Sequence, residues 1–119
     1  MKYVDGYVLP VPRKKLRAYR QIAQKAGKLW RKYGALEYLE CVGDDLSPKG
    51  PGIKFPRTVK AKPGETVVFS FIVFKSRAHR DRVNAKVMKD PSMSASQDQT
   101  MPFDVERMVY GGFKVIVDA

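Results

Sequence analysis

The only histidine of the chain, His79, lies in a strongly basic stretch that reads KSRAHRDRVNAKVMKDP. An unperturbed imidazole titrates near ~6.5, which makes histidine a natural general base for proton transfer at neutral pH. Three arginines lie within three residues of His79, and Asp81 is the only acid beside them. Ser76 is a suitable N-cap, so we expect a helix whose first turns carry His79 in surroundings that lower its affinity for a proton. The alternatives are a catalytic base and a structural or solvated histidine, and we favour the second.

Other signatures of catalysis are missing from the sequence. It contains no Ser/His/Asp spacing, no paired-carboxylate motif and no glycine-rich phosphate loop. One cysteine, Cys41, and one histidine cannot supply a Cys/His zinc site, and we expect neither a metal nor a cofactor. The alternating pattern around Cys41 favours a buried structural thiol over a reactive one. The sequence therefore assigns no catalytic residue.

Positive charge is the most prominent global property of the chain. Lysine and arginine number 23 against 12 acidic residues, and residues 13–32 carry nine basic side chains without an acid. Such a cluster attracts polyanions, and a helix over this segment would place the basic residues broadly opposite an apolar stripe. The candidate polyanion-binding residues are Lys14, Arg17, Lys25, Lys28 and Arg31. The alternative is a solvated helix surface, which we favour because neither an RNA-recognition motif nor a KH loop is recognisable.

Hydrophobic periodicity predicts alternating strands and helices. Residues 3–9 alternate with period two, and we expect Pro10 and Pro12 to end this strand. In the next segment apolar residues step by three and four, and Gly34 suits the C-terminal cap of the helix. The apolar stripe consists of Leu16, Tyr19, Ala23, Ala26, Trp30 and Tyr33. The elements expected further along are a strand over 35–43, a long loop with one helical turn over 43–64, a central strand over 65–75, a helix from Ser76 to Pro91, a loop over 94–100 and a last strand over 113–118.

This order of elements predicts an α+β fold of the ferredoxin-like βαββαβ type, with an antiparallel sheet and two helices on one face. The length of 119 residues and the hydrophobic content of 44% suit a single domain over 1–119. The longest apolar run, residues 67–74, is too short to span a bilayer, and the N-terminus lacks the pattern of a signal peptide. We therefore expect a cytoplasmic protein that does not enter a membrane.

Four segments resemble a known family, namely YVDGYVLPVP, ALEYLECVGDD, TVVFSFIVFKSRAHRDRVNAKVMKDP and MPFDVERMVYGGF. They cover nearly the whole chain, and their most specific pieces are SRAHRDRVNAKVMKDP and RMVYGGF. The sequence resembles the YbaA-like bacterial family of unknown function. This resemblance implies the dimeric α/β-barrel superfamily, in which two ferredoxin-like subunits join their sheets, and hence a homodimer. Relatives in that superfamily include cofactor-free monooxygenases, but the resemblance itself brings no reaction.

The two faces of the expected strands differ in polarity. The apolar face, which we expect to pack against the helices, comprises Val4, Gly6, Val8, Leu39, Cys41, Val67, Phe69, Phe71, Val73, Phe113, Val115 and Val117. The mixed face, which would line a partly wet pocket between two subunits, comprises Tyr3, Asp5, Tyr7, Tyr38, Glu40, Ser70 and Lys114. Charged groups are costly to bury unpaired. In the alternative, Asp5, Glu40 and Lys114 satisfy one another in a dimer interface that leaves no pocket.

Three classes of function remain open. We favour a homodimeric ligand-binding or interaction module for an unknown small molecule, which this architecture supports as readily as catalysis. The alternatives are a small monooxygenase-like enzyme of the barrel superfamily and RNA or DNA binding through the basic helix. Structural roles are expected for Arg80 with Asp81, and for Arg107, which would shape the start of the last strand rather than contact a substrate. Gly111 and Gly112 would permit a bulge or a close backbone approach at that strand.

Overall fold

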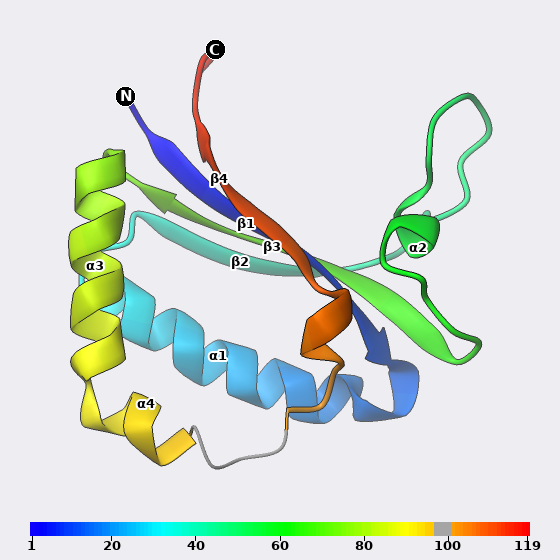
Figure 1. The fold of residues 1–119 in the computed structure, drawn as a ribbon, viewed down its shortest axis with the longest axis horizontal. Coiled ribbons are helices and arrows are strands. Elements are labelled where there is room, and N and C mark those ends of the chain that lie inside the picture. Colours follow the sequence, from blue (N-terminus) through cyan, green and yellow to red (C-terminus); the bar gives the residue numbers. More distant parts are fainter. Residues whose placement is uncertain (97–100) are drawn as a thin grey trace.

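The computed structural model describes residues 1–96 and 101–119 (Figure 1). Within these ranges the strands are β1 (Tyr3–Pro12), β2 (Glu37–Val42), β3 (Glu65–Phe74) and β4 (Val109–Lys114). The helices are α1 (Leu16–Lys32), α2 (Phe55–Thr58), α3 (Arg77–Lys89) and α4 (Pro91–Ser96), and the 3-10 turns are η1 (Arg13–Lys15) and η2 (Val105–Arg107). Each helix in these ranges is too short or too polar to span a bilayer. Of the loop expected over 94–100, residues 97–100 lie outside the described part, and residues 94–96 belong to α4.

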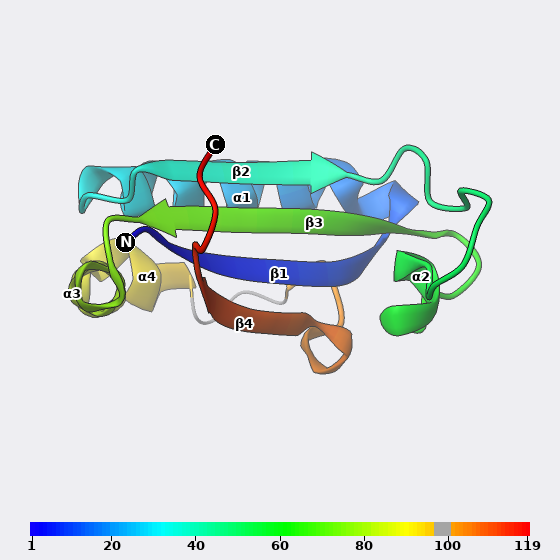
Figure 2. The same cartoon turned by 90° about the horizontal axis from the view of Figure 1, so that it is seen from above.

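The strands form one antiparallel sheet in the order β2-β3-β1-β4. β3 and β1 are the central strands, and β2 and β4 are the edges. α1 runs beneath the sheet, and α3 stands at one end of the same side (Figures 1 and 2). The alternation of strands and long helices confirms the predicted α+β class, with both long helices on one face of an antiparallel sheet. It also confirms the central position of β3.

The long helix α1 follows the expected stripe and ends at the expected glycine. Its buried residues are Tyr19, Ala23 and Gly27. Gly34 has a φ of +115°, which glycine adopts easily. The N–H of Ala35 bonds to the carbonyl of Trp30 at 3.0 Å, and the N–H of Gly34 bonds to that of Arg31 at 3.1 Å. These bonds form a Schellman cap, which ends α1 and turns the chain back towards β2.

β1 runs further than the sequence predicted. It continues through Pro10 and Pro12, which we expected to end it. Proline cannot donate to a neighbouring strand, and it is tolerated where one side of a strand is a free edge. β4 pairs with β1 only as far as Val8, so from Leu9 onward β1 is bonded to β3 alone. The two prolines therefore lie at a local edge of the sheet.

The last strand lies upstream of its predicted position. β4 spans Val109–Lys114 in place of 113–118, so Gly111 and Gly112 lie inside the strand. Both pair with β1 in an unbroken register, so the suggested bulge does not form. A Cβ on Gly112 would lie 2.8 Å from Cε2 and 2.9 Å from Cζ of Tyr3. The close approach at Gly112 is made by a side chain rather than by backbone, because glycine at this position leaves room for the Tyr3 ring of the neighbouring strand.

The helices cover the opposite face of the sheet from the one we predicted. Asp5 is only 4% exposed and lies beside Arg80 of α3, while Glu40 accepts a hydrogen bond from Tyr19 of α1. The helix-side face therefore carries Tyr3, Asp5, Tyr7, Tyr38, Glu40 and Ser70, together with Lys114, which pairs with Tyr3 at the end of β4. The assignment of this face to a partner subunit was wrong because the helices themselves supply the partners that its polar groups need.

The apolar face of the sheet is left open by the long helices. Phe113 is 63% exposed, Phe69 43% and Leu39 42%. α2 covers one end of this face, where the rings of Phe55 and Phe69 lie 6.2 Å apart. Cys41 was expected to be buried, but it lies on this face and is exposed. We define the open face as Val4, Gly6, Val8, Leu39, Cys41, Phe69, Phe71, Val109 and Phe113.

Arg107 fastens the segment before β4 to the start of β3. Its Nη1 and Nη2 donate to the two carboxylate oxygens of Glu65, each at 2.7 Å, and its Nε donates to Asp104 at 3.0 Å. Nη1 also donates to the carbonyl of Lys60 at 3.0 Å. The contact between Arg107 and Glu65 is bidentate, which is the arrangement that gives an arginine–carboxylate pair its strongest hydrogen bonding. It gives Arg107 the structural role that we favoured.

We expect the Glu65–Arg107 pair to stabilise the protein at neutral pH and to lose that effect in acid. The hydrogen bonds from Arg107 lower the pKa of Glu65 from 4.5 to about 2. Between these values the unfolded chain binds more protons than the folded one, so stability falls as the pH drops through this window. Urea unfolding of Glu65→Gln should show a loss of about 1–3 kcal/mol at pH 7.

The same comparison with wild type at about pH 3 should show a difference less than half as large, because most of the linked stabilisation is gone there. Glu37→Gln, on the exposed start of β2, is the control and should differ little from wild type at either pH. An equal loss for Glu65→Gln at both pH values would contradict the assignment.

Candidate functional site

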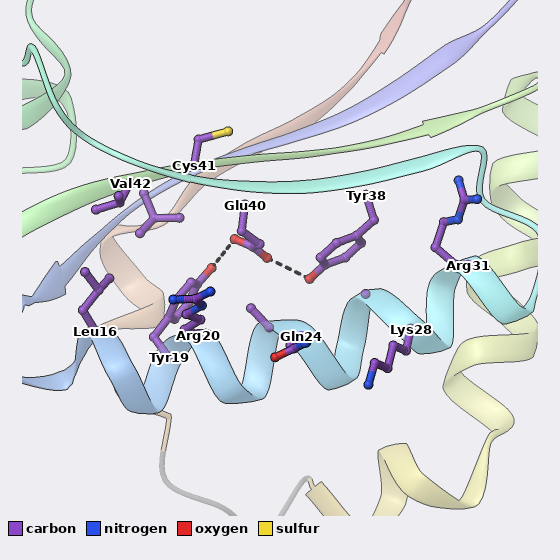
Figure 3. Close-up of a pocket in the computed structure, with 13 residues that line it drawn as sticks. Leu16, Tyr19, Arg20, Gln24, Lys28, Arg31, Tyr38, Glu40, Cys41 and Val42 are labelled. Atoms are coloured by element: carbon purple, nitrogen blue, oxygen red, sulfur yellow. Dashed lines mark hydrogen bonds between the residues drawn. The ribbon is translucent and has the colours of Figure 1, made fainter.

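Glu40 lies at the centre of a cluster of aromatic side chains between α1 and β2. The hydroxyl of Tyr19 donates to its Oε1 and that of Tyr38 to its Oε2, both at 2.7 Å (Figure 3). Glu40 and Tyr38 point to the same side because they are two residues apart on one strand. In the described part of the chain, no lysine or arginine forms an ion pair with Glu40. The carboxylate is therefore held by two neutral donors.

Gly27 allows α1 to approach β2 closely enough for these bonds. A Cβ at this position would lie 2.7 Å from Cδ1 and 2.9 Å from Cε1 of Tyr38, closer than real carbon contacts. Trp30 packs beside the same ring, with centroids 6.2 Å apart, and its indole N–H donates to Asn84 of α3 at 3.0 Å. A glycine inside a helix costs about 1 kcal/mol in propensity. Here the missing side chain of Gly27 leaves the space that the Tyr38 ring occupies.

A first hollow, which we name the outer groove, lies between α1 and the edge strand β2 (Figure 3). Its volume is about 800 Å³. It is lined by Leu16, Tyr19, Arg20, Ala23, Gln24, Gly27, Lys28, Arg31, Tyr38, Glu40, Cys41, Val42 and Val68. Three of these residues, Arg20, Lys28 and Arg31, bring positive charge to its α1 side. The outer groove thus combines a largely apolar base with a cationic wall.

A second hollow, which we name the inner hollow, lies between the sheet and α1 and extends to α4 and the segment before β4. Its volume is about 710 Å³. It is lined by Tyr7, Leu9, Tyr19, Ile22, Lys25, Ala26, Leu29, Trp30, Tyr38, Glu40, Ser70, Ile72, Ser92, Met93, Met101, Phe103 and Met108. Tyr19, Tyr38 and Glu40 line both hollows. The walls of the inner hollow are mostly aromatic and aliphatic, and among the described residues that line it Glu40 is the only acidic one.

The tyrosines around Glu40 stay protonated over a wide pH range. Burial raises the pKa of Tyr7 to about 12. Burial, together with the neighbouring Glu40 carboxylate, raises the pKa of Tyr19 and of Tyr38 further still. At neutral pH their hydroxyls therefore act as donors, and Glu40 accepts hydrogen bonds from two of them.

Tyr3 and Asp5 belong to a separate cluster under α3. Arg80 Nη1 lies 3.6 Å from the Asp5 carboxylate, and Nη2 donates to the Tyr3 hydroxyl at 3.2 Å. Arg80 Nε also lies 3.1 Å from Asp81. Burial raises the pKa of Asp5, against the opposing effect of Arg80. These contacts tie α3 to β1, which supports the structural role expected for Arg80 and Asp81.

His79 has the contacts of a structural histidine. Its Nδ1 accepts the backbone N–H of Lys75 at 3.0 Å, and its own backbone N–H donates to the N-cap hydroxyl of Ser76 at 3.1 Å. Its ring packs edge-on against Phe74, with centroids 6.1 Å apart. Burial, with the nearby positive charges of Lys75 and Arg82, lowers the pKa of His79. The imidazole lines neither hollow, so it is not placed to act there as a base.

Comparison with known proteins places this architecture in a family. Residues 2–105 match the model of the family described as "Protein of unknown function (DUF1428)". The chain belongs to this family. It is 48% identical over 118 residues to the uncharacterized protein YbaA of Escherichia coli strain K12, and the alignment covers 99% of each chain. The same figures hold for YbaA of Shigella flexneri. The predicted resemblance to the YbaA-like family is confirmed.

A solved structure with a similar fold is described as "De novo designed protein Foldit4". The TM-score is 0.51, the sequence identity is 10%, and the match covers 97% of this chain and 99% of the designed one. At this identity the likeness concerns the fold alone. It shows that the α+β arrangement is one that a sequence chosen without evolutionary history also adopts.

The structure gathers only part of the predicted pocket. Four of its residues line the inner hollow, namely Tyr7, Tyr38, Glu40 and Ser70. Tyr3 and Asp5 lie under α3 instead, and Lys114 is exposed at the end of β4. The predicted position between subunits was wrong because these residues face the helices of their own chain.

Sequence reasoning missed the residues that complete the inner hollow from outside the strands. Tyr19 and Trp30 were assigned only to the apolar stripe of α1, and Phe103 and Met108 were not assigned to any site. The available signal was that the stripe and the facing strand both carry aromatic residues with polar tips, which seek hydrogen-bond partners when buried.

The predicted polyanion-binding residues are exposed along one helical segment. Lys14 lies in η1, and the others on α1 are Arg17, Lys25, Lys28 and Arg31. Lys28 and Arg31 line the outer groove, and Lys25 lines the inner hollow. Nucleic-acid binding through this surface stays a prediction. In the residues that the structure describes, no cluster of three or more His, Cys, Asp or Glu side chains could hold a metal ion.

Proposed function

We propose that the protein is a cytoplasmic, homodimeric ligand-binding protein that holds a small organic molecule in the inner hollow. The observation that supports this most directly is the hollow itself, with about 710 Å³ between sheet and helix. The hollow reaches the buried side chains between the sheet and α1 and opens to solvent, so a small molecule can enter it. Small-molecule sites typically have this size, apolar walls and a few polar groups. Glu40 and Ser70 are polar groups of this kind.

The homodimer is supported by the open face. Its nine residues come from all four strands and are uncharged, and the charged side chain of Glu37 lies beside them at the start of the edge strand β2. Large exposed apolar patches mark interaction sites, and a largely apolar face can pack against its own copy across a two-fold axis. A second copy would cover Phe69 and Phe113 and leave both hollows on the outer sides of the two sheets.

Binding in the inner hollow is tested by native mass spectrometry of the protein purified from its host. We expect wild type to carry a small molecule that denaturation releases. Ala26→Phe should reduce the bound fraction about tenfold or more, because Ala26 lines the inner hollow and a phenyl ring would fill part of it. Ala18→Phe is the matched control, since Ala18 is exposed on the same helix and lines neither hollow. Wild type without an adduct, or equal loss in both variants, would contradict the proposal.

Catalysis has less support than binding in this fold. His79 is engaged with backbone groups and lies outside both hollows. Glu40 is the one carboxylate among the described residues that line the inner hollow, and its two oxygens already accept hydrogen bonds from tyrosine hydroxyls. A ligand-binding role requires no change in the hydrogen bonds between Glu40 and its two tyrosines.

A further inference from the structure

We propose that the ligand of the inner hollow is an organic cation, an amine or quaternary ammonium compound with an apolar body, whose positive group lies against Glu40. This inference rests on the proposed function, and it adds the chemical class of the ligand and the residue that recognises it. Three observations carry it: the unpaired charge of Glu40, the aromatic walls and the distribution of basic residues around the two hollows.

Glu40 has no lysine or arginine partner among the described residues, although lysine and arginine are abundant in this chain. The formal net charge is +11, yet none of the described lysines and arginines pairs with this half-buried carboxylate. An ionised carboxylate accepts about four hydrogen bonds, and the two hydroxyl donors of Tyr19 and Tyr38 use two of these sites. Partial burial makes an uncompensated charge costly. A cationic group in the inner hollow would supply the missing partner.

The walls of the inner hollow suit the rest of such a ligand. Aromatic rings attract cations through their negative faces, and sites for quaternary ammonium groups are built from several of them. Tyr38 and Trp30 form one neighbouring pair, with centroids 6.2 Å apart, and Tyr19 and Phe103 form another at 5.6 Å. The hydrogen bonds to Glu40 hold Tyr19 and Tyr38 in place. Aromatic rings thus surround the carboxylate on the side of the inner hollow.

The basic residues distinguish the two hollows that share Glu40. Arg20, Lys28 and Arg31 line the outer groove and would repel a cation there. Of the described residues that line the inner hollow, Lys25 is the only basic one, and that side chain is exposed. An anionic ligand in the inner hollow would instead place its charge beside Glu40 without a fixed cation to offset it. The distribution of charge therefore favours a cation in the inner hollow.

Three probes with the same aromatic body test the charge preference: 2-phenylethylamine as its ammonium ion, neutral 2-phenylethanol and anionic phenylacetate. Trp30 is the only tryptophan, so its single indole N–H signal in a proton–nitrogen NMR spectrum reports on the wall of the inner hollow. In titrations at pH 7 we expect the ammonium probe to bind about tenfold or more tightly than the alcohol, and phenylacetate to bind weakest. Glu40→Gln should remove most of this preference while the alcohol still binds. Glu37→Gln, on the same strand but lining neither hollow, should keep it.

The outcomes separate the two proposals. Equal binding of amine and alcohol, tighter binding of phenylacetate, or an unchanged preference in Glu40→Gln would overturn the cation class but leave the inner hollow as a binding site. Absence of binding by all three probes would overturn the cation class as well. If native mass spectrometry also finds no retained molecule, the proposed function fails with it.

Discussion

Replacing Phe113 with glutamate should raise the dissociation constant of the homodimer about a hundredfold or more. Phe113 is 63% exposed in the single chain and lies over Gly6, where a Cβ would be 3.7 Å from its ring. Although β4 is an edge strand, the Phe113 ring therefore reaches over the central strand β1 and forms part of the open face. In a two-fold dimer the substitution would place an unpaired charge in the apolar interface from each subunit. The fold of the subunit should be little affected, because the side chain faces water there.

Light scattering at micromolar concentration measures the effect. Wild type should show twice the 13.5 kDa mass of one chain, and Phe113→Glu should show the mass of one. Lys114→Glu is the matched control, because the neighbouring residue is exposed on the helix side of the same strand. It should remain dimeric. A monomeric wild type would refute the homodimer, and dissociation of both variants would attribute the effect to net charge rather than to the open face.

The sequence was sufficient for the kinds and order of the elements but not for the choice of sheet face. Period-two alternation correctly grouped Asp5, Tyr7 and Glu40 on one side of the sheet, since side chains alternate along every strand. It could not say on which side the helices lie. We placed them on the more apolar side, but on the helices Tyr19 donates a hydrogen bond to Glu40 and Arg80 forms an ion pair with Asp5. Such partners depend on contacts between residues far apart in the chain, which local patterning does not report.

The predicted ends of strands were wrong where pairing with a neighbouring strand determines them. Pro10 and Pro12 usually end strands, but here they fall beyond the last pair that β1 makes with β4. The last strand was expected to begin at Phe113, after Gly111 and Gly112, but both glycines lie within β4, where they pair with β1. Both errors come from using local propensity at positions that tertiary packing controls.

Half of the site was visible in the sequence and half was not. Glu40 and Tyr38 were singled out because a carboxylate and a phenol on one strand face need partners. How closely α1 approaches β2 depends on Gly27, which lies against the Tyr38 ring and lines the outer groove. In the sequence Gly27 is only an unfavourable residue within a helix.

Gly27→Ala should therefore destabilise the protein by about 1–3 kcal/mol, although alanine is the better helix former. The new methyl group would lie 2.7 Å and 2.9 Å from two carbons of the Tyr38 ring. The ring is rigid, it packs beside Trp30, and its hydroxyl is bonded to Glu40, so it cannot move aside without losing contacts. The steric cost should exceed the gain in propensity of about 1 kcal/mol. The bond from Tyr38 to Glu40 should lengthen or break.

A double-mutant cycle with Tyr38→Ala separates these two effects. In the Tyr38→Ala background the methyl group meets no ring, so Gly27→Ala should become neutral or stabilising by up to about 1 kcal/mol. Urea unfolding of the four proteins should thus give a coupling of about 1 kcal/mol or more, with Gly27→Ala destabilising when Tyr38 is present and neutral or stabilising when it is absent. If Gly27→Ala instead stabilises the protein that retains Tyr38, a methyl group at position 27 fits without a clash. The Tyr38 ring would then not determine the distance between α1 and β2.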